Sequence, residues 1–263
     1  MQTSARPPAV AGMFYPSDPA ELRAQVRGFL DAAAGDGPRP LALIAPHAGY
    51  VYSGRVAGSA YARLTPVAHE IERVVLLGPC HRVPVQGLAA SSAGAFSTPL
   101  GDVPVDRGGV ESILDLPQVA IFDETHDQEH SLEVHLPFLQ EAIGPFELVP
   151  LVVGDATDDE VAEVLRRLWS GPETLVVVSS DLSHYLDYET ARKVDHATSR
   201  SIEALEVDGL GPRTACGRIP IRGLLTEAKR RGLSVTTVDL CNSGDTAGPS
   251  DQVVGYGAYV VHA

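Results

Sequence analysis

The sequence has only three cysteines, few basic residues and no long hydrophobic run. An odd number of cysteines scattered over 263 residues does not suit a disulfide framework, so their role, if any, is chemical. No stretch is long and apolar enough to span a bilayer. The first eight residues also lack the apolar core of a signal peptide, and we therefore expect a cytoplasmic protein without membrane contact.

Acidic residues outnumber basic ones by 34 to 20, which gives a formal net charge of -14 and a pI of about 5.0. A nucleic acid or an anionic membrane would favour a basic face, so the charge argues against both as partners. No glycine-rich nucleotide-binding fingerprint follows any predicted strand. Repeats, low-complexity tracts and linkers are also missing from the sequence, which predicts one domain over residues 1–263.

Predicted strands and helices alternate along the chain. Apolar runs predict strands, and amphipathic stretches behind capping residues such as Asp18 predict helices. Strands are expected at 41–45, 73–78, 85–91, 149–153, 174–178, 234–240 and 253–261. Helices are expected at 19–34, 54–64, 158–168, 188–205 and 219–230, with an irregular hairpin over 94–106. This alternation is typical of an α/β domain with a central, mainly parallel sheet flanked by helices.

Three of the nine histidines follow predicted strands. His47 follows the strand 41–45, His81 follows 73–78, and His184 lies in the loop after 174–178. A lone histidine is more often structural, but ligands of open α/β sheets gather at the carboxyl ends of the strands. We therefore expect these three side chains to share a site.

Two further histidines, His130 and His135, lie five residues apart. On a helix this spacing separates them by about 140°, so they cannot bind one metal ion together as an HExxH pair does. A zincin-type site is therefore rejected. We expect His130 to point into the site while His135 caps a helix or packs.

Cys216 is the cysteine with the strongest chemical context. It precedes Gly217, Arg218, Ile219 and Pro220, and the proline suggests the first turn of a helix. A thiol beside an arginine at such a position is expected to have a lowered pKa, which favours the thiolate that a metal ion needs. The alternative is a small buried hydrophobic residue, which is the interpretation preferred for Cys80 and Cys241.

Asp181 lies three residues before His184. It could accept a proton from a ligand, orient an imidazole, or simply cap its loop. The remaining histidines lie in charged or terminal segments, where we expect them to be solvated and assign them no role. They are His69, His126, His196 and His262.

Five spaced segments resemble the Memo family, which is called AmmeMemoRadiSam system protein B in bacteria and archaea. They run in the family's order through nearly the whole chain. The segments are Pro46-His47-Ala48-Gly49-Tyr50, Gly78-Pro79-Cys80-His81, Glu129-His130-Ser131-Leu132-Glu133-Val134-His135-Leu136-Pro137, Ser179-Ser180-Asp181-Leu182-Ser183-His184 and Cys216-Gly217-Arg218-Ile219-Pro220.

The resemblance implies a fold similar to that of class III extradiol dioxygenases, which are non-haem iron enzymes. It also implies a metal centre at His47, His81 and Cys216, with His184, Asp181 and His130 around its open side. A cysteine stands where the dioxygenases use a carboxylate, and a thiolate tolerates Cu(I), Zn(II) or Fe(II). His184 is the acid/base candidate, because the ordinary pKa of histidine is nearest neutrality.

Three functions follow from this resemblance. The first is a metal-dependent oxidoreductase, with iron or copper, that acts with oxygen on a small substrate such as a phenol. The second is a non-catalytic module that binds a metal or a peptide. The third is a zinc-dependent hydrolase, in which the metal lowers the pKa of bound water to about 7. The family also implies pathway partners of the AMMECR type and the radical SAM type.

Overall fold

The computed structural model describes residues 4–263, and four adjacent parallel strands form its centre. Their order across the sheet is β2, β9, β3 and β8. These strands are β2 Ala42–Ala45, β9 Thr174–Ser179, β3 Arg73–Pro79 and β8 Glu147–Val153. The prediction of an α/β domain with a central, mainly parallel sheet is confirmed.

Antiparallel strands complete the sheet on both sides. On one side β12 pairs with β2 and is itself flanked by β10 and β11, and on the other β4 pairs with β8 and carries β7. Their bounds are β4 Leu88–Ala90, β7 Val119–Ile121, β10 His184–Leu186, β11 Ser234–Asn242 and β12 Val253–His262. A second sheet contains β1 Ala5–Arg6 and the predicted hairpin, formed by β5 Ala95–Thr98 and β6 Gly101–Pro104.

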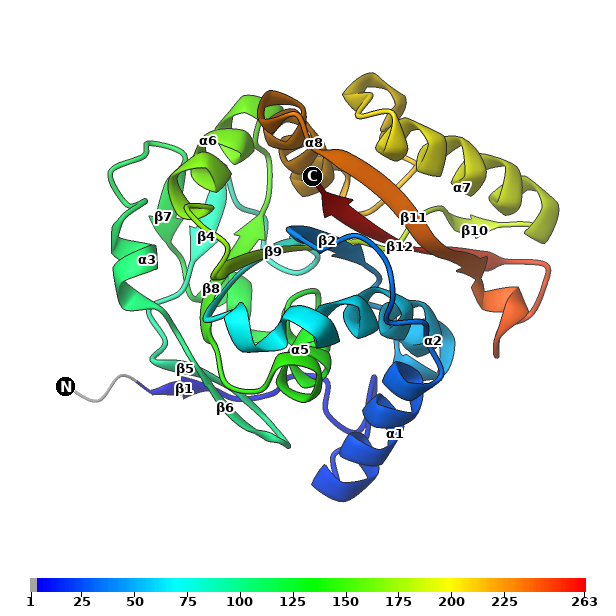
Figure 1. Ribbon diagram of the computed structural model, residues 1–263, viewed down its shortest axis with the longest axis horizontal. Coiled ribbons are helices and arrows are strands. Elements are labelled where there is room, and N and C mark those ends of the chain that lie inside the picture. Colours follow the sequence, from blue (N-terminus) through cyan, green and yellow to red (C-terminus); the bar gives the residue numbers. More distant parts are fainter. Residues whose placement is uncertain (1–3) are drawn as a thin grey trace.

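Helices cover both faces of the large sheet. Figure 1 shows α1, α2 and α5 on one face and α6, α7 and α8 on the other. The long helices are α1 Pro19–Asp31, α2 Tyr50–Tyr61, α5 Leu136–Ile143, α6 Asp158–Leu168, α7 Tyr188–Glu203 and α8 Arg218–Arg231. Shorter ones are α3 Arg107–Glu111, α4 Glu124–Asp127 and the 3-10 turns Ala62–Glu70, Glu133–His135, Val207–Gly209 and Ser243–Asp245. Within residues 4–263, none of these helices has the length and apolar character needed to cross a membrane.

Local signals set several helix ends. The Asp18 side chain accepts hydrogen bonds from the backbone N–H groups of Ala20 and Glu21, which caps α1. Thr157 and Glu160 form a reciprocal capping box at the start of α6. At the end of α8, Gly232 adopts a φ of 68°, a conformation that glycine reaches without steric cost.

Helix α2 begins four residues earlier than predicted, because Gly54 does not mark its start. A Cβ at Gly54 would lie 2.4 Å from Cε2 of Phe29, and one at Gly58 would lie 2.8 Å from the Phe29 carbonyl oxygen. Both glycines are therefore interior positions where α1 crosses α2 closely. Helix α2 starts at Tyr50, shortly after His47.

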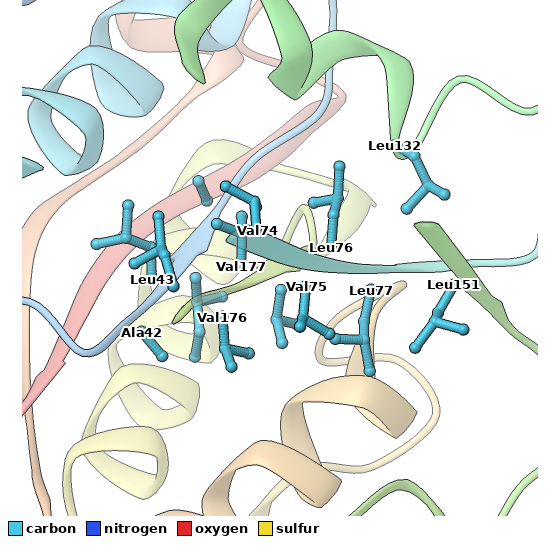
Figure 2. Close-up of a cluster of buried hydrophobic side chains, with 14 of the residues drawn as sticks. Ala42, Leu43, Val74, Val75, Leu76, Leu77, Leu132, Leu151, Val176 and Val177 are labelled. Carbon is cyan, nitrogen blue, oxygen red and sulfur yellow. The ribbon is translucent and has the colours of Figure 1, made fainter. Parts of the chain in front are cut away.

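The core is made by side chains on both faces of the parallel strands. Figure 2 shows Val74 and Leu76 on one face of β3, and Val75 and Leu77 on the other. All four are fully buried. Because helices cover both faces, the central strands are continuously apolar rather than alternating. Polar residues stand only at the two ends of these strands.

Candidate metal centre

The carboxyl ends of β2, β9 and β3 lie side by side and bring distant residues together. His47 follows β2, His81 follows β3, and Cys216 comes from the loop before α8. One ring nitrogen of each histidine and the Cys216 sulfur all lie within 4.8 Å of one another. His47 Nε2 is 3.4 Å from Cys216 Sγ. The structure thus brings together the three ligands that the resemblance implies.

A serine at the end of β9 sets the proton position on His47. Ser179 donates its hydroxyl proton to the Ser131 carbonyl at 2.6 Å, so its oxygen accepts from His47 Nδ1 at 2.5 Å. Burial, followed by the nearby histidines, lowers the pKa of His47 well below its ordinary value. The ring is therefore neutral, with a lone pair on Nε2 that faces the sulfur.

The buried carboxylate of Glu129 holds His81. It accepts the His81 backbone N–H at 2.6 Å and Nδ1–H at 2.9 Å. It also accepts the backbone N–H groups of His130 and Ser131, both at 3.0 Å. Burial alone would raise the pKa of Glu129, but the hydrogen bonds from His81 reverse this and lower it to about 2. Because four donors occupy Glu129, it orients His81 and leaves Nε2 free to bind a metal ion.

The thiol of Cys216 does not have the lowered pKa that its neighbour Arg218 suggested. Burial, followed by the nearby charge of Asp181, raises the pKa of Cys216 to about 12. That prediction was wrong because it considered the arginine two residues along the sequence, and not the burial of the thiol and the Asp181 carboxylate nearby. The Asp181 backbone N–H donates to Sγ at 3.3 Å. A thiolate at this position therefore needs a further positive charge, which a metal ion would supply if one bound here.

Asp181 links the His47 loop to the Cys216 loop. Its Oδ1 accepts the His47 backbone N–H at 2.9 Å, and its Oδ2 is 4.0 Å from His47 Nε2. Burial raises the pKa of this carboxyl to about 6. Asp181 thus lies at the edge of the three-residue cluster with a raised pKa.

A cavity of about 340 Å³ opens beside the cluster. Asp181, His130 and His184 line it together with Phe14, Tyr52 and Tyr256. The Phe14 and His130 rings lie 4.9 Å apart. This cavity combines an aromatic wall with three titratable groups, a composition typical of small-molecule sites.

His184 lies on β10, where the pairing with β12 is irregular. Its Nδ1 lies 2.8 Å from the Leu182 carbonyl oxygen, which can only accept, so Nδ1 carries a proton and Nε2 is not used in this bond. The next residue, Tyr185, has a φ of 58°, which is unusual for a non-glycine residue. This strained turn places His184 at the wall of the cavity and leaves Tyr185 exposed at its rim.

His130 and His135 occupy different environments. The His130 ring lies 4.7 Å from His81 and 5.4 Å from His47, measured between ring centroids. His135 is fully buried instead and shares a 2.7 Å hydrogen bond with the Tyr61 hydroxyl. His130 thus borders the cluster, while His135 packs behind it.

His126 is not solvated as predicted. It is only 2 % exposed, and its Nε2 lies 3.0 Å from the Ala89 carbonyl oxygen. The short helix α4 packs its ring edge-on against Phe96 of the hairpin, with the centroids 5.8 Å apart. Burial lowers the pKa of His126 to about 4. By contrast, His69 and His196 are exposed as expected, and His262 is partly exposed.

Sequence reasoning missed the residues that orient the histidines. Glu129 stands next to His130 in a singled-out segment, and Ser179 ends the strand before Asp181, but neither was assigned a role. A second buried carboxylate, Glu133, forms an ion pair with Arg6 and accepts the Tyr15 hydroxyl at 2.6 Å. Arg6 also donates to the Glu129 carbonyl at 2.6 Å. These bonds connect the segment that carries Phe14 to the segment that contains Glu129 and Glu133.

The donor set fits a resident metal ion. Two imidazoles with free Nε2 atoms and a sulfur lie close enough to share one ion, and both rings are oriented by hydrogen bonds at Nδ1. Nitrogen and sulfur donors suit zinc, copper and iron, and do not suit magnesium or calcium. The residues present therefore fit the kind of metal that the resemblance implies, without choosing among these three.

Comparisons with known proteins agree with this architecture. The family model described as "Memo-like protein" matches residues 6–260. A MEMO1 family protein of Aquifex aeolicus is 39% identical over 268 residues, which cover 95% of this chain and 97% of the relative. Another from Methanosarcina mazei is 35% identical, with 97% of this chain and 98% of the relative covered. The chain therefore belongs to the Memo family, and the predicted resemblance is confirmed.

The likeness to a solved structure concerns the fold. The uncharacterized protein JW3007 of Escherichia coli K12 superposes with a TM-score of 0.53 at 13% sequence identity. The match covers 84% of this chain and 100% of that protein. It supports the shared α/β architecture and says nothing about chemistry.

Proposed function

We propose that this Memo family protein is a metal-dependent oxidoreductase that acts with oxygen on a small substrate such as a phenol. The observation that supports it most is the cluster of His47, His81 and Cys216, with both rings oriented at Nδ1 and their Nε2 atoms free. We assign to this cluster iron or copper, which would supply the electron transfer to oxygen.

The residues around the cluster would accept and donate protons. His184 has its Nε2 lone pair available on the wall of the 340 Å³ cavity, so it can accept the proton of a phenolic hydroxyl. Asp181, with its pKa raised to about 6 by burial, can pass a proton between the cavity and the cluster. His130, whose pKa burial lowers to about 4, remains neutral and can accept a hydrogen bond from the substrate.

The cavity wall favours an aromatic substrate. Phe14, Tyr52 and Tyr256 offer flat apolar surfaces against which a ring can pack. Asp181 and His184 on the same wall offer partners for a hydroxyl group. A small phenol satisfies both kinds of surface at once.

Oxygen uptake by protein loaded with Fe(II) or Cu, measured with a panel of catechols and phenols, tests this proposal. We expect substrate-dependent uptake that falls at least about 100-fold in the His184→Ala variant, since general acid–base groups contribute factors of this size. His196→Ala, which changes an exposed histidine, is the matched control. Metal binding without uptake for any compound in the panel would contradict the proposal.

A zinc hydrolase is the second candidate, because two nitrogens, one sulfur and an open position also match catalytic zinc sites. Zinc as the sole bound metal after iron-replete growth, with ester hydrolysis and no oxygen uptake, would favour it. A binding module would retain the metal or a peptide and show neither reaction.

A further inference from the structure

A second cavity, of about 370 Å³, adjoins the cluster. His81 and Cys216 line it, and it shares no lining residue with the aromatic cavity. Its other walls come from the loop after β3, from the end of β8 and from the first turn of α8. Two residues of the cluster thus line this cavity, whereas none of the three lines the aromatic cavity.

Two arginines line this second cavity, Arg82 directly after His81 and Arg218 at the start of α8. Between residues 4 and 263, neither has a carboxylate oxygen within 4.0 Å. Most other arginines of the chain are in ion pairs, as Arg73 with Asp106 and Arg222 with Asp158 illustrate.

These two arginines lie in a protein whose overall charge is negative. The chain carries a net charge of -14, so carboxylates are abundant on the molecule. Among residues 4–263, Asp155 is nevertheless the only acidic residue that lines this cavity, against two arginines. The cavity therefore concentrates positive charge beside the cluster in an otherwise acidic protein.

We propose that this cavity is an anion-binding subsite that takes the carboxylate or phosphate group of a small molecule. Guanidinium groups bind these oxyanions through paired, charge-assisted hydrogen bonds. The volume lies within the range of small-molecule sites and is too small for a folded partner. The subsite is distinct from the cavity assigned to the phenol, and it requires no bound metal.

Anion titrations of the full-length protein test this inference. The protein is first dialysed against a chelator, so that an anion cannot bind a metal ion directly. Inorganic phosphate and acetate are then titrated at constant ionic strength, with binding followed by calorimetry. Saturable binding of phosphate alone assigns a phosphate group, and saturable binding of acetate alone or of both anions assigns a carboxylate-accepting site. The absence of saturable binding for both anions would overturn the inference.

Variants distinguish anion binding at a specific subsite from nonspecific attraction of anions to positive charge. Arg82→Gln and Arg218→Gln should each weaken the binding, and the double variant should weaken it by about tenfold or more. Lys229→Gln removes the same charge from the opposite end of α8 and should change it by less than about twofold. Unchanged binding in the double variant, or an equal loss in Lys229→Gln, would overturn the inference. Because metal is removed first, this outcome is independent of whether the proposed oxidoreductase activity is found.

Discussion

His81 donates a 2.9 Å hydrogen bond from Nδ1 to the carboxylate of Glu129, which also accepts the His81 backbone N–H. Both the ring and its backbone are therefore fixed by one buried side chain. A carboxylate that orients an imidazole in this way raises the basicity of the other ring nitrogen. Glu129 thus controls how well His81 can bind a metal ion.

Replacing this carboxylate with an amide tests its role. In Glu129→Gln the amide NH₂ group would face backbone N–H donors, so the side chain can no longer satisfy all four of them. We expect metal affinity to fall by about 10- to 100-fold, measured by competition with a chromophoric chelator. Glu124→Gln, an exposed change in the preceding helix, is the control. Equal affinities for wild type and Glu129→Gln would show that Glu129 does not support the centre.

The buried ion pair between Arg6 and Glu133 should be important for stability. Arg6→Ala leaves Glu133 charged and buried, so we expect a loss of about 3–5 kcal/mol in the free energy of unfolding. Arg27→Ala removes an exposed guanidinium from Glu141, which keeps its pair with Arg23, and should cost less than about 1 kcal/mol. Urea unfolding of both variants gives the comparison, and similar losses in the two would refute the prediction.

The close crossing of α1 and α2 predicts opposite effects for two glycine substitutions. Gly54→Ala would push a methyl group into the Phe29 ring and should destabilise the protein by about 1–3 kcal/mol. Gly28→Ala in α1 meets no atom within 4 Å and should stabilise it by about 0.5–1 kcal/mol through helix propensity. Thermal unfolding measures both, and a stabilised Gly54→Ala would mean that the crossing is looser than described.

Buried His126 should make the protein sensitive to mild acid. Its pKa is lowered by burial to about 4 in the folded state, whereas an unfolded histidine titrates near 6.5. Below pH 6.5 the unfolded state therefore binds the extra proton, and stability falls as the pH drops. Between pH 7.5 and pH 5 this one residue should account for about 2 kcal/mol.

His126→Gln isolates this contribution, since the amide can still donate to the Ala89 carbonyl but cannot titrate. We expect its stability to vary less between pH 7.5 and pH 5 than that of the wild type, by about 2 kcal/mol in urea titrations. His69→Gln, at an exposed position, should follow the wild-type curve. Identical pH profiles for wild type and His126→Gln would contradict the assignment.

The sequence allowed much of the fold to be predicted, because apolar runs and capping residues are local signals. Helix 158–168 was predicted to the residue from its acidic start, and in the structure Thr157 and Glu160 cap that start. The predicted start of α2 was wrong because Gly54 packs closely against Phe29, and no local sequence pattern reveals that contact.

Only the part of the candidate site that follows from the strand topology could be predicted from the sequence. His47 and His81 meet because parallel strands end at the same edge, and that rule applies to any such sequence. The partners Ser179 and Glu129 depend on strand order and on the path of residues 123–135, which the sequence pattern does not reveal. The predicted lowering of the Cys216 pKa was wrong for the same reason, since its burial and its proximity to Asp181 come from the fold and not from the neighbouring sequence.

Metal content measured by elemental analysis tests the central claim most directly. Wild-type protein, His47→Ala, Cys216→Ser and the control Cys241→Ser would be purified under identical conditions and checked for folding by circular dichroism. We predict about one iron or copper ion per chain in the wild type and in Cys241→Ser, and a loss of most of it in the other two variants. Unchanged metal content in both His47→Ala and Cys216→Ser would contradict the account.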